Sequence, residues 1–172
     1  MNDSIQIRPE QPDDIAAIRR VNERAFDGPT EADLIDLLRA HGKVTLSLVA
    51  VHEAQVVGHI LFSPVVIGAT GKSAAAVGLA PMAVLPEWQN QGVGSRLVRA
   101  GLEACRRLGH RAAVVLGHAN YYPRFGFAPA SRFHIRSEYD VPDEIFMAME
   151  LEPGALAACA GTAKYQAEFN DI

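Results

Sequence analysis

The sequence predicts an α/β or α+β protein with one mixed central sheet, and three observations carry that prediction. Apolar runs typical of strands alternate with helical periodicities along the chain. One helical pattern, residues 92–109, lies between two buried apolar runs, residues 74–85 and 112–116, which is typical of a βαβ unit with a parallel strand pair. No repeat, linker or low-complexity tract interrupts the 172 residues, so we expect residues 1–172 to form a single domain.

Composition and charge exclude several classes of protein. Hydrophobic residues make up 49% of the chain and charged residues 21%, which is a globular rather than a disordered composition. The net charge of −4 argues against a protein that grips nucleic-acid backbones, although it allows a local anion site. Two cysteines are too few for a secreted disulfide scaffold, so we expect a cytoplasmic protein. The polar N-terminus and the absence of a long apolar run predict neither a signal peptide nor a membrane span.

The N-terminal part of the chain predicts a strand and two helices. Residues 4–8 alternate like a short strand that ends at Pro9. Asp13 and Asp14 then open a helix, because carboxylates suit the positive end of a helix dipole. Thr30 is the expected N-cap of a second helix that carries leucines on one face.

Three apolar runs follow. Residues 46–52 and 56–62 predict an antiparallel hairpin, although its turn lacks an Asn-Gly signal. Residues 74–85 predict a strand buried on both faces, and Pro81 inside this run predicts a bulge, an edge or a place where two strands part. The remaining predicted elements are a helix over residues 92–109, strands over 112–116 and 145–151, an aromatic segment over 121–127 and a last edge strand within 162–169.

A glycine turn joins the third apolar run to the long helix. Gly92 and Gly94 allow positive φ and a close approach of a ligand to bare backbone. The first turn of a helix leaves about four N–H groups without intrahelical partners, so it can cradle an anion. Ser95 adds a hydroxyl and Arg96 a positive charge. The turn lacks the lysine of a Walker loop and the spacing of a dinucleotide site. A turn that serves helix packing alone is the competing interpretation.

Two motifs carry a resemblance to a known family. The pattern Gln89-x-x-Gly92-x-Gly94 is similar to the Arg/Gln-x-x-Gly-x-Gly/Ala motif of the GCN5-related N-acetyltransferase (GNAT) superfamily, which binds coenzyme A there. The run from Tyr122 to Phe127 resembles the Tyr-x-x-x-Gly-Phe element of that family. The order of elements resembles the family over residues 5–151, and the closing segment resembles a small bacterial subgroup of predicted acetyltransferases.

The resemblance implies a coenzyme site and explains why a proline, Pro81, stands inside the central strand. In this family the central strand carries a bulge and splays from the next parallel strand, which leaves a wedge for the pantetheine arm. Backbone groups of the strand would then pair with the arm, and the N–H of Met82 or a neighbour would polarise the thioester carbonyl. The expected residues for binding acetyl-CoA, which is the implied co-substrate, are Met82, Ala83, Val84, Gln89, Asn90, Gln91, Gly92, Val93, Gly94, Ser95 and Arg96.

The resemblance also suggests catalytic residues. Tyr122 matches the family tyrosine that faces the coenzyme sulfur, and a phenol protonated at pH 7 could donate to the leaving thiolate. The general base stays open, because the central strand lacks the glutamate that many members carry there. Glu31, His118, a chain of waters and an acceptor that arrives neutral are the alternatives. The histidines and cysteines lack the spacing of a metal site, so no metal is expected.

The sequence therefore predicts an acyl-CoA-dependent N-acyltransferase that moves an acetyl group directly to a primary amine. The competing hypothesis is an acyl-CoA-binding sensor without turnover, which the missing strand carboxylate favours and Tyr122 opposes. The expected partners are acetyl-CoA and a small-molecule or peptide amine, with no nucleic acid or membrane. A homodimer through the terminal strand is possible, because open sheet edges invite pairing.

Overall fold

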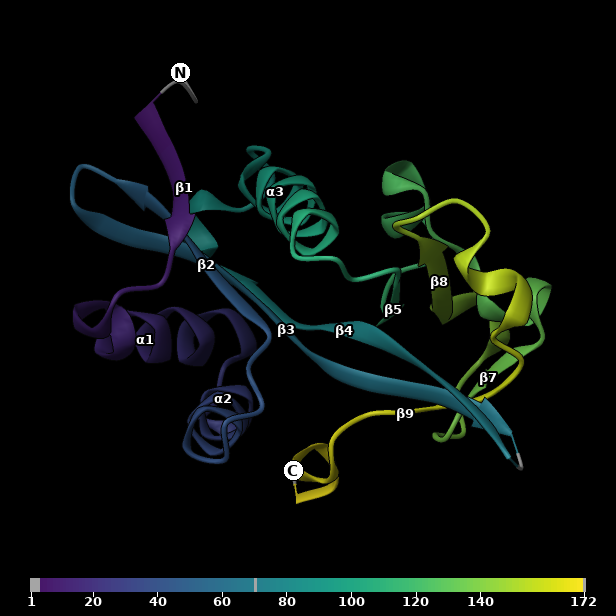
Figure 1. The fold of residues 1–172 in the computed structure, drawn as a ribbon. Helices are drawn as coiled ribbons and strands as arrows, with labels where there is room; N and C mark the ends of the chain where they lie inside the picture. The colour runs from purple at the N-terminus through teal and green to yellow at the C-terminus, as the bar shows by residue number, and fades with distance from the viewer. Residues whose placement is uncertain (1–3, 70, 172) are drawn as a thin grey trace. The chain divides into compact units, whose positions relative to one another are not determined.

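The computed structural model describes residues 4–69 and 71–171, and its strands form the predicted mixed sheet with accompanying helices (Figure 1). The first residues of the polar N-terminus lie outside this range. The chain divides into two compact units. The first unit contains residues 1–62, 81–101 and 167–172, and the second contains residues 63–80 and 102–166.

The elements follow the chain in this order. The strands are β1 (Ile5–Pro9), β2 (Leu46–His52), β3 (Gln55–Ala69), β4 (Lys72–Val84), β5 (Ala112–Leu116), β6 (Ala128–Pro129), β7 (Ile135–Ser137), β8 (Phe146–Glu150) and β9 (Gly161–Lys164). The α-helices are α1 (Ile15–Phe26), α2 (Thr30–Ala40) and α3 (Val93–Arg107). Hydrogen bonds connect the strands in the order β1-β2-β3-β4-β5-β8-β6, and β9 pairs with both β3 and β7.

In the first unit, β1, β2 and the N-terminal part of β3 pair antiparallel. The turn between β2 and β3 consists of Glu53 and Ala54, both with positive φ, 45° and 66°. Two left-handed residues match the twist of a tight hairpin, even when neither is glycine. The predicted hairpin is therefore confirmed, and its turn is made by residues that sequence preference disfavours.

Helices cover opposite faces of these strands. A Cβ atom placed on Gly58 of β3 would lie 3.0 Å from Leu97 Cδ1, so α3 packs directly against this position. The next residue, His59, points to the other face, where it meets Asn22 of α1. The sheet of the first unit thus has α3 on one side and α1 on the other.

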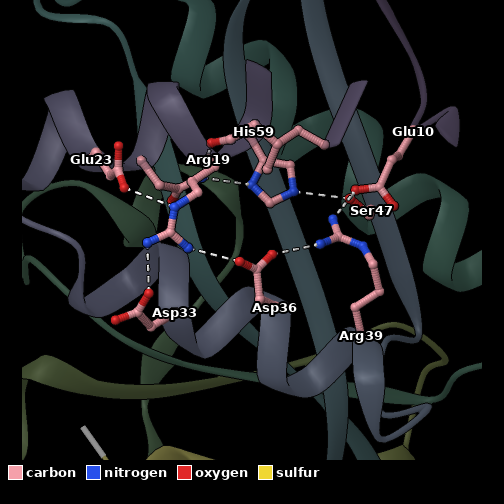
Figure 2. A network of polar contacts seen from close by, with 10 residues as sticks. Glu10, Arg19, Glu23, Asp33, Asp36, Arg39, Ser47 and His59 are labelled. Atoms are coloured by element: carbon pink, nitrogen blue, oxygen red, sulfur yellow. Dashed lines mark hydrogen bonds and ion pairs between the residues drawn. The ribbon is translucent and has the colours of Figure 1, made fainter. Parts of the chain in front are cut away.

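His59 is a buried polar residue that joins three elements (Figure 2). Its Nδ1 lies 3.3 Å from Asn22 Nδ2, and its Nε2 lies 2.9 Å from Ser47 Oγ. Burial, aided by the charge of Arg39, lowers the pKa of His59 to about 3, so the ring is neutral at pH 7. Because the Nδ2 atom of Asn22 can only donate, Nδ1 of His59 accepts and its Nε2–H donates to Ser47, whose hydroxyl donates to Glu10. His59 is therefore a core residue whose hydrogen bonds place the ring proton on Nε2.

An ion-pair network joins α1 to α2 on the surface (Figure 2). The guanidinium of Arg19 pairs with Glu23 on its own helix and with Asp33 and Asp36 on α2. Asp36 also pairs with Arg39. Exposed pairs stabilise little one by one, but this shared arginine holds the two helices in one register and so positions the first turn of α2.

In the second unit, β4 and β5 pair in parallel over Val77–Leu79, which confirms the predicted βαβ unit. β5 pairs antiparallel with β8, and β8 with β6. The pairing with β5 ends at Leu79, whereas β4 runs on to Val84. A central strand that outlasts its parallel partner agrees with the splayed sheet that the resemblance implied.

Some predicted details are wrong. Thr30 is the first residue of α2 and Pro29 occupies the N-cap position. β9 is short and has a strand on each side, so it is not an edge strand, because alternation along a chain does not reveal how many partners a strand meets. The helix predicted over residues 92–109 ends at Arg107, and Leu108 beyond it is 60% exposed. β3 continues beyond Phe62 to Ala69, where β9 gives it a further partner.

Searched over its described residues, the chain has no helix with the length and apolar character needed to cross a membrane.

Candidate functional site

The segment that leaves β4 is held in the first unit by backbone hydrogen bonds. Leu85 N–H donates to Val57 O of β3 at 2.9 Å, and a 3₁₀ turn, Pro86–Trp88, follows it. The side chain of Gln89 then turns back and donates from Nε2 to Val84 O at 2.9 Å. Hydrogen bonds therefore hold the chain in place both before and after the 3₁₀ turn that follows β4.

The glycine turn itself contains two left-handed residues. Asn90 has φ 61° and Gly92 has φ 85°. Asparagine and glycine tolerate this conformation best, which explains their place here. Gln91 braces the turn through a 2.9 Å hydrogen bond from Nε2 to Glu87 O. The side chains of Gln89 and Gln91 thus shape the loop, so any contact with a ligand falls to the exposed backbone.

The first turn of α3 presents its N–H groups next to this loop. Val93 is buried and anchors the helix start, while Gly94 and Ser95 are half-buried. The helical bonding begins with Arg96 N–H, which donates to Gly92 O at 3.1 Å. The first N–H groups of any helix lack an intrahelical acceptor and lie at the positive end of its dipole, so this helix start has the chemistry expected of an anion site. We name residues Gln89–Arg96 the glycine cradle.

The charges around the glycine cradle are already partly paired. Arg96 Nη2 donates to Ile5 O at 2.7 Å, which ties the start of α3 to β1. Glu87, just before the cradle, forms two bonds with Arg24 of α1, at 2.8 and 2.9 Å. This arginine holds the pKa of Glu87 below its usual range. A carboxylate beside the cradle is thus neutralised, which leaves the helix dipole unopposed.

The other residues expected to bind the coenzyme lie at the end of β4. Ala83 and Val84 are buried, and Met82 is half-buried. They follow the last position that pairs with β5, Leu79. The side chains of Ala83 and Val84 lie in the core, so at these two positions a ligand could meet only the backbone.

Tyr122 lies in the second unit at the start of the 3₁₀ turn Tyr122–Phe125. Its side chain is 7% exposed and packs edge-on against Tyr121 and Phe127, with ring centroids 5.1 and 5.8 Å away. Gly126, with φ 109°, closes the turn. Burial raises the pKa of Tyr122 to about 12, with a smaller contribution from Tyr121. The phenol is therefore a proton donor across the physiological pH range.

A glycine that sequence reasoning missed makes room for this ring. A Cβ atom on Gly117, which directly follows β5, would lie 2.2 Å from Tyr122 Cε2. No side chain can stand that close to a ring carbon. The only signal in the sequence is a glycine at the end of a buried strand, which does not name the ring that needs the space. We call Tyr122 with Gly117, Tyr121 and Phe127 the tyrosine pocket.

The two candidate bases lie in different units. Glu31 is half-buried in the first turn of α2, in the first unit. His118 is exposed in the second unit, and its carbonyl oxygen accepts hydrogen bonds from the N–H groups of Tyr121 and Tyr122, at 3.0 and 3.3 Å. His118 therefore supports the turn that carries Tyr122 through its backbone, which leaves its side chain available for chemistry.

A search of the described residues for three or more histidine, cysteine, aspartate or glutamate side chains placed to hold a metal ion finds no such group.

The chain is similar to known proteins. A family model, the acetyltransferase (GNAT) domain, matches residues 6–130. The uncharacterized N-acetyltransferase YjhQ of Escherichia coli K12 is 43% identical over 134 residues, which cover 76% of this chain and 74% of that protein.

Solved structures agree over almost the whole chain. The GNAT family N-acetyltransferase YhbS of Escherichia coli, solved in complex with CoA, has a TM-score of 0.92 and 35% identity, and the match covers 97% of this chain and 92% of that one. A GNAT family acetyltransferase of Brucella melitensis, solved with acetyl-CoA, has a TM-score of 0.80 and 39% identity, over 96% and 97% of the two chains. The chain belongs to the GNAT acetyltransferase family.

Proposed function

We propose that this protein transfers an acetyl group from acetyl-CoA directly to a primary amine. The observation that carries the proposal is the glycine cradle, an exposed turn with left-handed Asn90 and Gly92 directly before the first N–H groups of α3. Such a site suits a pyrophosphate, because several backbone donors and a helix dipole converge on it. YhbS with CoA and the Brucella protein with acetyl-CoA, both more than 30% identical, support coenzyme A as the source of that pyrophosphate.

In this proposal the backbone of Gln91–Ser95 holds the pyrophosphate and the backbone of Met82–Val84 receives the pantetheine arm. A chain that ends its pairing with β5 at Leu79 keeps the later backbone groups of β4 for such a partner. The N–H of Met82 would donate to the thioester oxygen as negative charge develops on it.

Tyr122 is the proposed general acid. The amine nitrogen attacks the acyl carbon, the new C–N bond forms, and the C–S bond breaks as the phenol gives its proton to the leaving sulfur. The raised pKa of Tyr122 keeps that proton in place until the thiolate, a stronger base than a thioester, appears. The proton that the amine loses goes to Glu31, to His118 or to water, and these alternatives stay open.

The test is a thiol-release assay with acetyl-CoA and a panel of primary amines, preceded by calorimetry with coenzyme A. We expect micromolar-range binding of coenzyme A, on the order of that of ordinary substrates, and thiol release that depends on at least one amine. Glu31→Gln and His118→Ala separate the candidate bases, since only loss of the true base lowers kcat while coenzyme affinity is kept.

One observation favours the alternative of an acyl-CoA-binding sensor, namely that the segment of β4 beyond the β5 pairing, Ala80–Val84, carries no carboxylate. Tight coenzyme binding without thiol release from any amine would support the sensor and contradict the transferase.

A further inference from the structure

A short 3₁₀ helix, Ala167–Asp171, packs against α2. The chain leaves the second unit at Gln166, and the residues after it belong to the first unit. We name Ala167–Asp171 the strap. Glu168 near its start is only 8% exposed, although its side chain is a carboxylate. A carboxylate buried to this extent needs partners, so those partners determine how firmly the strap is held on α2.

The main partner of Glu168 is His41, the residue at the end of α2. Its Nδ1 lies 3.0 Å from Glu168 Oε1, and because a carboxylate only accepts, the ring nitrogen is the donor. The other carboxylate oxygen, Oε2, is buried and has no hydrogen-bond partner within the described residues. The hydrogen bond from His41 and, to a smaller extent, the charges of His41 and Lys43 hold the pKa of Glu168 below its usual range. The carboxylate is therefore ionised at neutral pH.

The way in which α2 ends fixes the position of His41. Gly42 follows with φ 67°, and Lys43 N–H donates to Leu38 O at 2.8 Å. These are features of a helix that ends at a left-handed glycine. His41 thus stands between two negative groups, the carbonyl end of α2 and the carboxylate of Glu168. A positively charged imidazole stabilises both.

The other charged groups near the strap do not change charge near neutral pH or are engaged elsewhere. Three further charged side chains of α2 form ion pairs away from the strap: Asp33, Asp36 and Arg39. Glu31 stands in the first turn of α2, so about 15 Å of helix separates it from His41. Asp171, on the strap itself, is exposed. A lysine such as Lys43 carries its charge throughout the neutral range. His41 is therefore the group facing Glu168 that can change charge near pH 7.

We propose that His41 and Glu168 form a pH-sensitive latch that holds the strap on α2. The latch is closed while the imidazole is positive and the carboxylate is negative, and it loosens when His41 loses its charge. The imidazole is 51% exposed, so it exchanges protons with the solvent, whereas the carboxylate is 11% exposed. A neutral imidazole can still donate from Nδ1, but it no longer offsets the buried carboxylate or the negative end of the helix. Because α2 also carries Glu31, the latch gives the helix of a candidate base a pH-dependent support.

The two groups of the latch respond to pH in opposite directions. The pKa of Glu168 is lowered, so its contribution is present above the ordinary pKa of glutamate, about 4.3, and is lost as pH falls through the lowered value. A histidine beside an anion contributes below its ordinary pKa, about 6.5, and this contribution is lost as pH rises. The strap should therefore be held most firmly between about pH 5 and 6 and should loosen toward pH 8.

Hydrogen exchange of the strap amides in the full chain tests the latch. Protection, expressed relative to an unstructured peptide at the same pH, measures the fraction of time that the strap is open. We expect the open fraction to rise about fivefold between about pH 5.8 and pH 8.2 in the wild type, while the protection of β2 and β3 stays the same. The measurement needs no coenzyme, so its outcome is independent of the proposed function.

Four variants separate charge from packing. His41→Arg carries a permanent charge and should keep the strap closed at both pH values. His41→Gln keeps a donor without a charge and should leave the strap loose at both, as should Glu168→Gln. His134→Gln is the matched control, because His134 is an exposed histidine of the second unit, and it should respond to pH like the wild type. An equal open fraction of the wild-type strap at the two pH values, a pH response that persists in His41→Gln, or an equal loss of protection in β2 and β3 would overturn the latch.

Discussion

The glycine cradle consists mainly of backbone groups, whereas the tyrosine pocket depends on one buried side chain. The cradle offers backbone N–H groups, and the side chains of Gln89 and Gln91 hydrogen-bond back to the loop. The tyrosine pocket uses one buried side chain, and its backbone only makes space through Gly117. A backbone site is sensitive to any side chain that fills it and indifferent to pH, because amides do not titrate. A side-chain site is sensitive to the loss of one oxygen and to the volume around it.

The largest effect should come from removing that oxygen. Tyr122→Phe keeps the ring and its packing but removes the phenol, so we expect kcat to fall about 10²–10⁴-fold with coenzyme affinity unchanged. Steady-state kinetics and calorimetry measure the two quantities separately. Tyr121→Phe, at the neighbouring ring, is the control and should keep its kcat. A Tyr122→Phe protein with full turnover would remove Tyr122 from the acid role.

In the glycine cradle, the most disruptive change should be the addition of a side chain at one of its glycines. Gly94→Glu and Gly92→Glu bring bulk and a negative charge to the N–H groups, so we expect coenzyme affinity to fall about 100-fold or more. Gly92 has φ 85°, so its variant also carries backbone strain. Gly28→Glu is the control, because a Cβ there meets no atom within 4 Å. Unchanged affinity in Gly94→Glu would rule out a pyrophosphate at the cradle.

The two regions should also differ in their response to an added methyl group. Gly117→Ala forces a methyl group into the space of the Tyr122 ring, and we expect overpacking to lower the free energy of unfolding by about 1–3 kcal/mol. The displaced phenol should lower kcat as well, whereas coenzyme affinity should stay the same. Urea denaturation and kinetics of Gly117→Ala, compared with Gly28→Ala, check both. An alanine that leaves stability and kcat intact would show that the ring can move without cost.

Of the two regions, only the tyrosine pocket should respond to pH, and only at strongly alkaline pH. Because the pKa of Tyr122 is about 12, the phenol keeps its proton to well above pH 10, and kcat should not fall between pH 7 and 10. The raised pKa also makes a contribution to stability that is complete below about pH 10 and is lost as pH rises toward 12. Urea midpoints at pH 9 and pH 11 should therefore differ more for the wild type than for Tyr122→Phe. An alkaline loss of kcat with a midpoint near 10 would indicate a phenol with an ordinary pKa.

The smallest effect should come from the ion pair beside the cradle. Arg24 and Glu87 are about half exposed, and exposed pairs contribute little. We expect Arg24→Met to change coenzyme affinity less than about threefold, measured by calorimetry at low and high salt. A larger loss at both salt concentrations would mean that the pair sets the shape of the loop.

Local patterns were enough to predict most of the elements. The strand Ala112–Leu116 and the helix after the glycine turn follow from apolar periodicity, which is a property of neighbours along the chain. The glycine turn could be predicted for the same reason, because it and the first turn of α3 are contiguous, whereas its role as an anion site stays a prediction. The hydrogen bonds that Gln89 and Gln91 make back to the loop could not be predicted, since the sequence indicated only that these residues belong to the coenzyme site.

The sequence by itself determined the βαβ order, the hairpin, the glycine turn before α3 and the resemblance to the GNAT family. The tertiary structure decided what lies beside Tyr122 and Tyr165. Gly117 and Gly78 leave space that the rings of Tyr122 and Tyr165 fill, and the carboxylate of Glu138 accepts a hydrogen bond from the backbone N–H of Tyr165, 27 residues away. Such contacts depend on how β5, β7 and β9 fold back on one another, and no periodicity in a single segment encodes them.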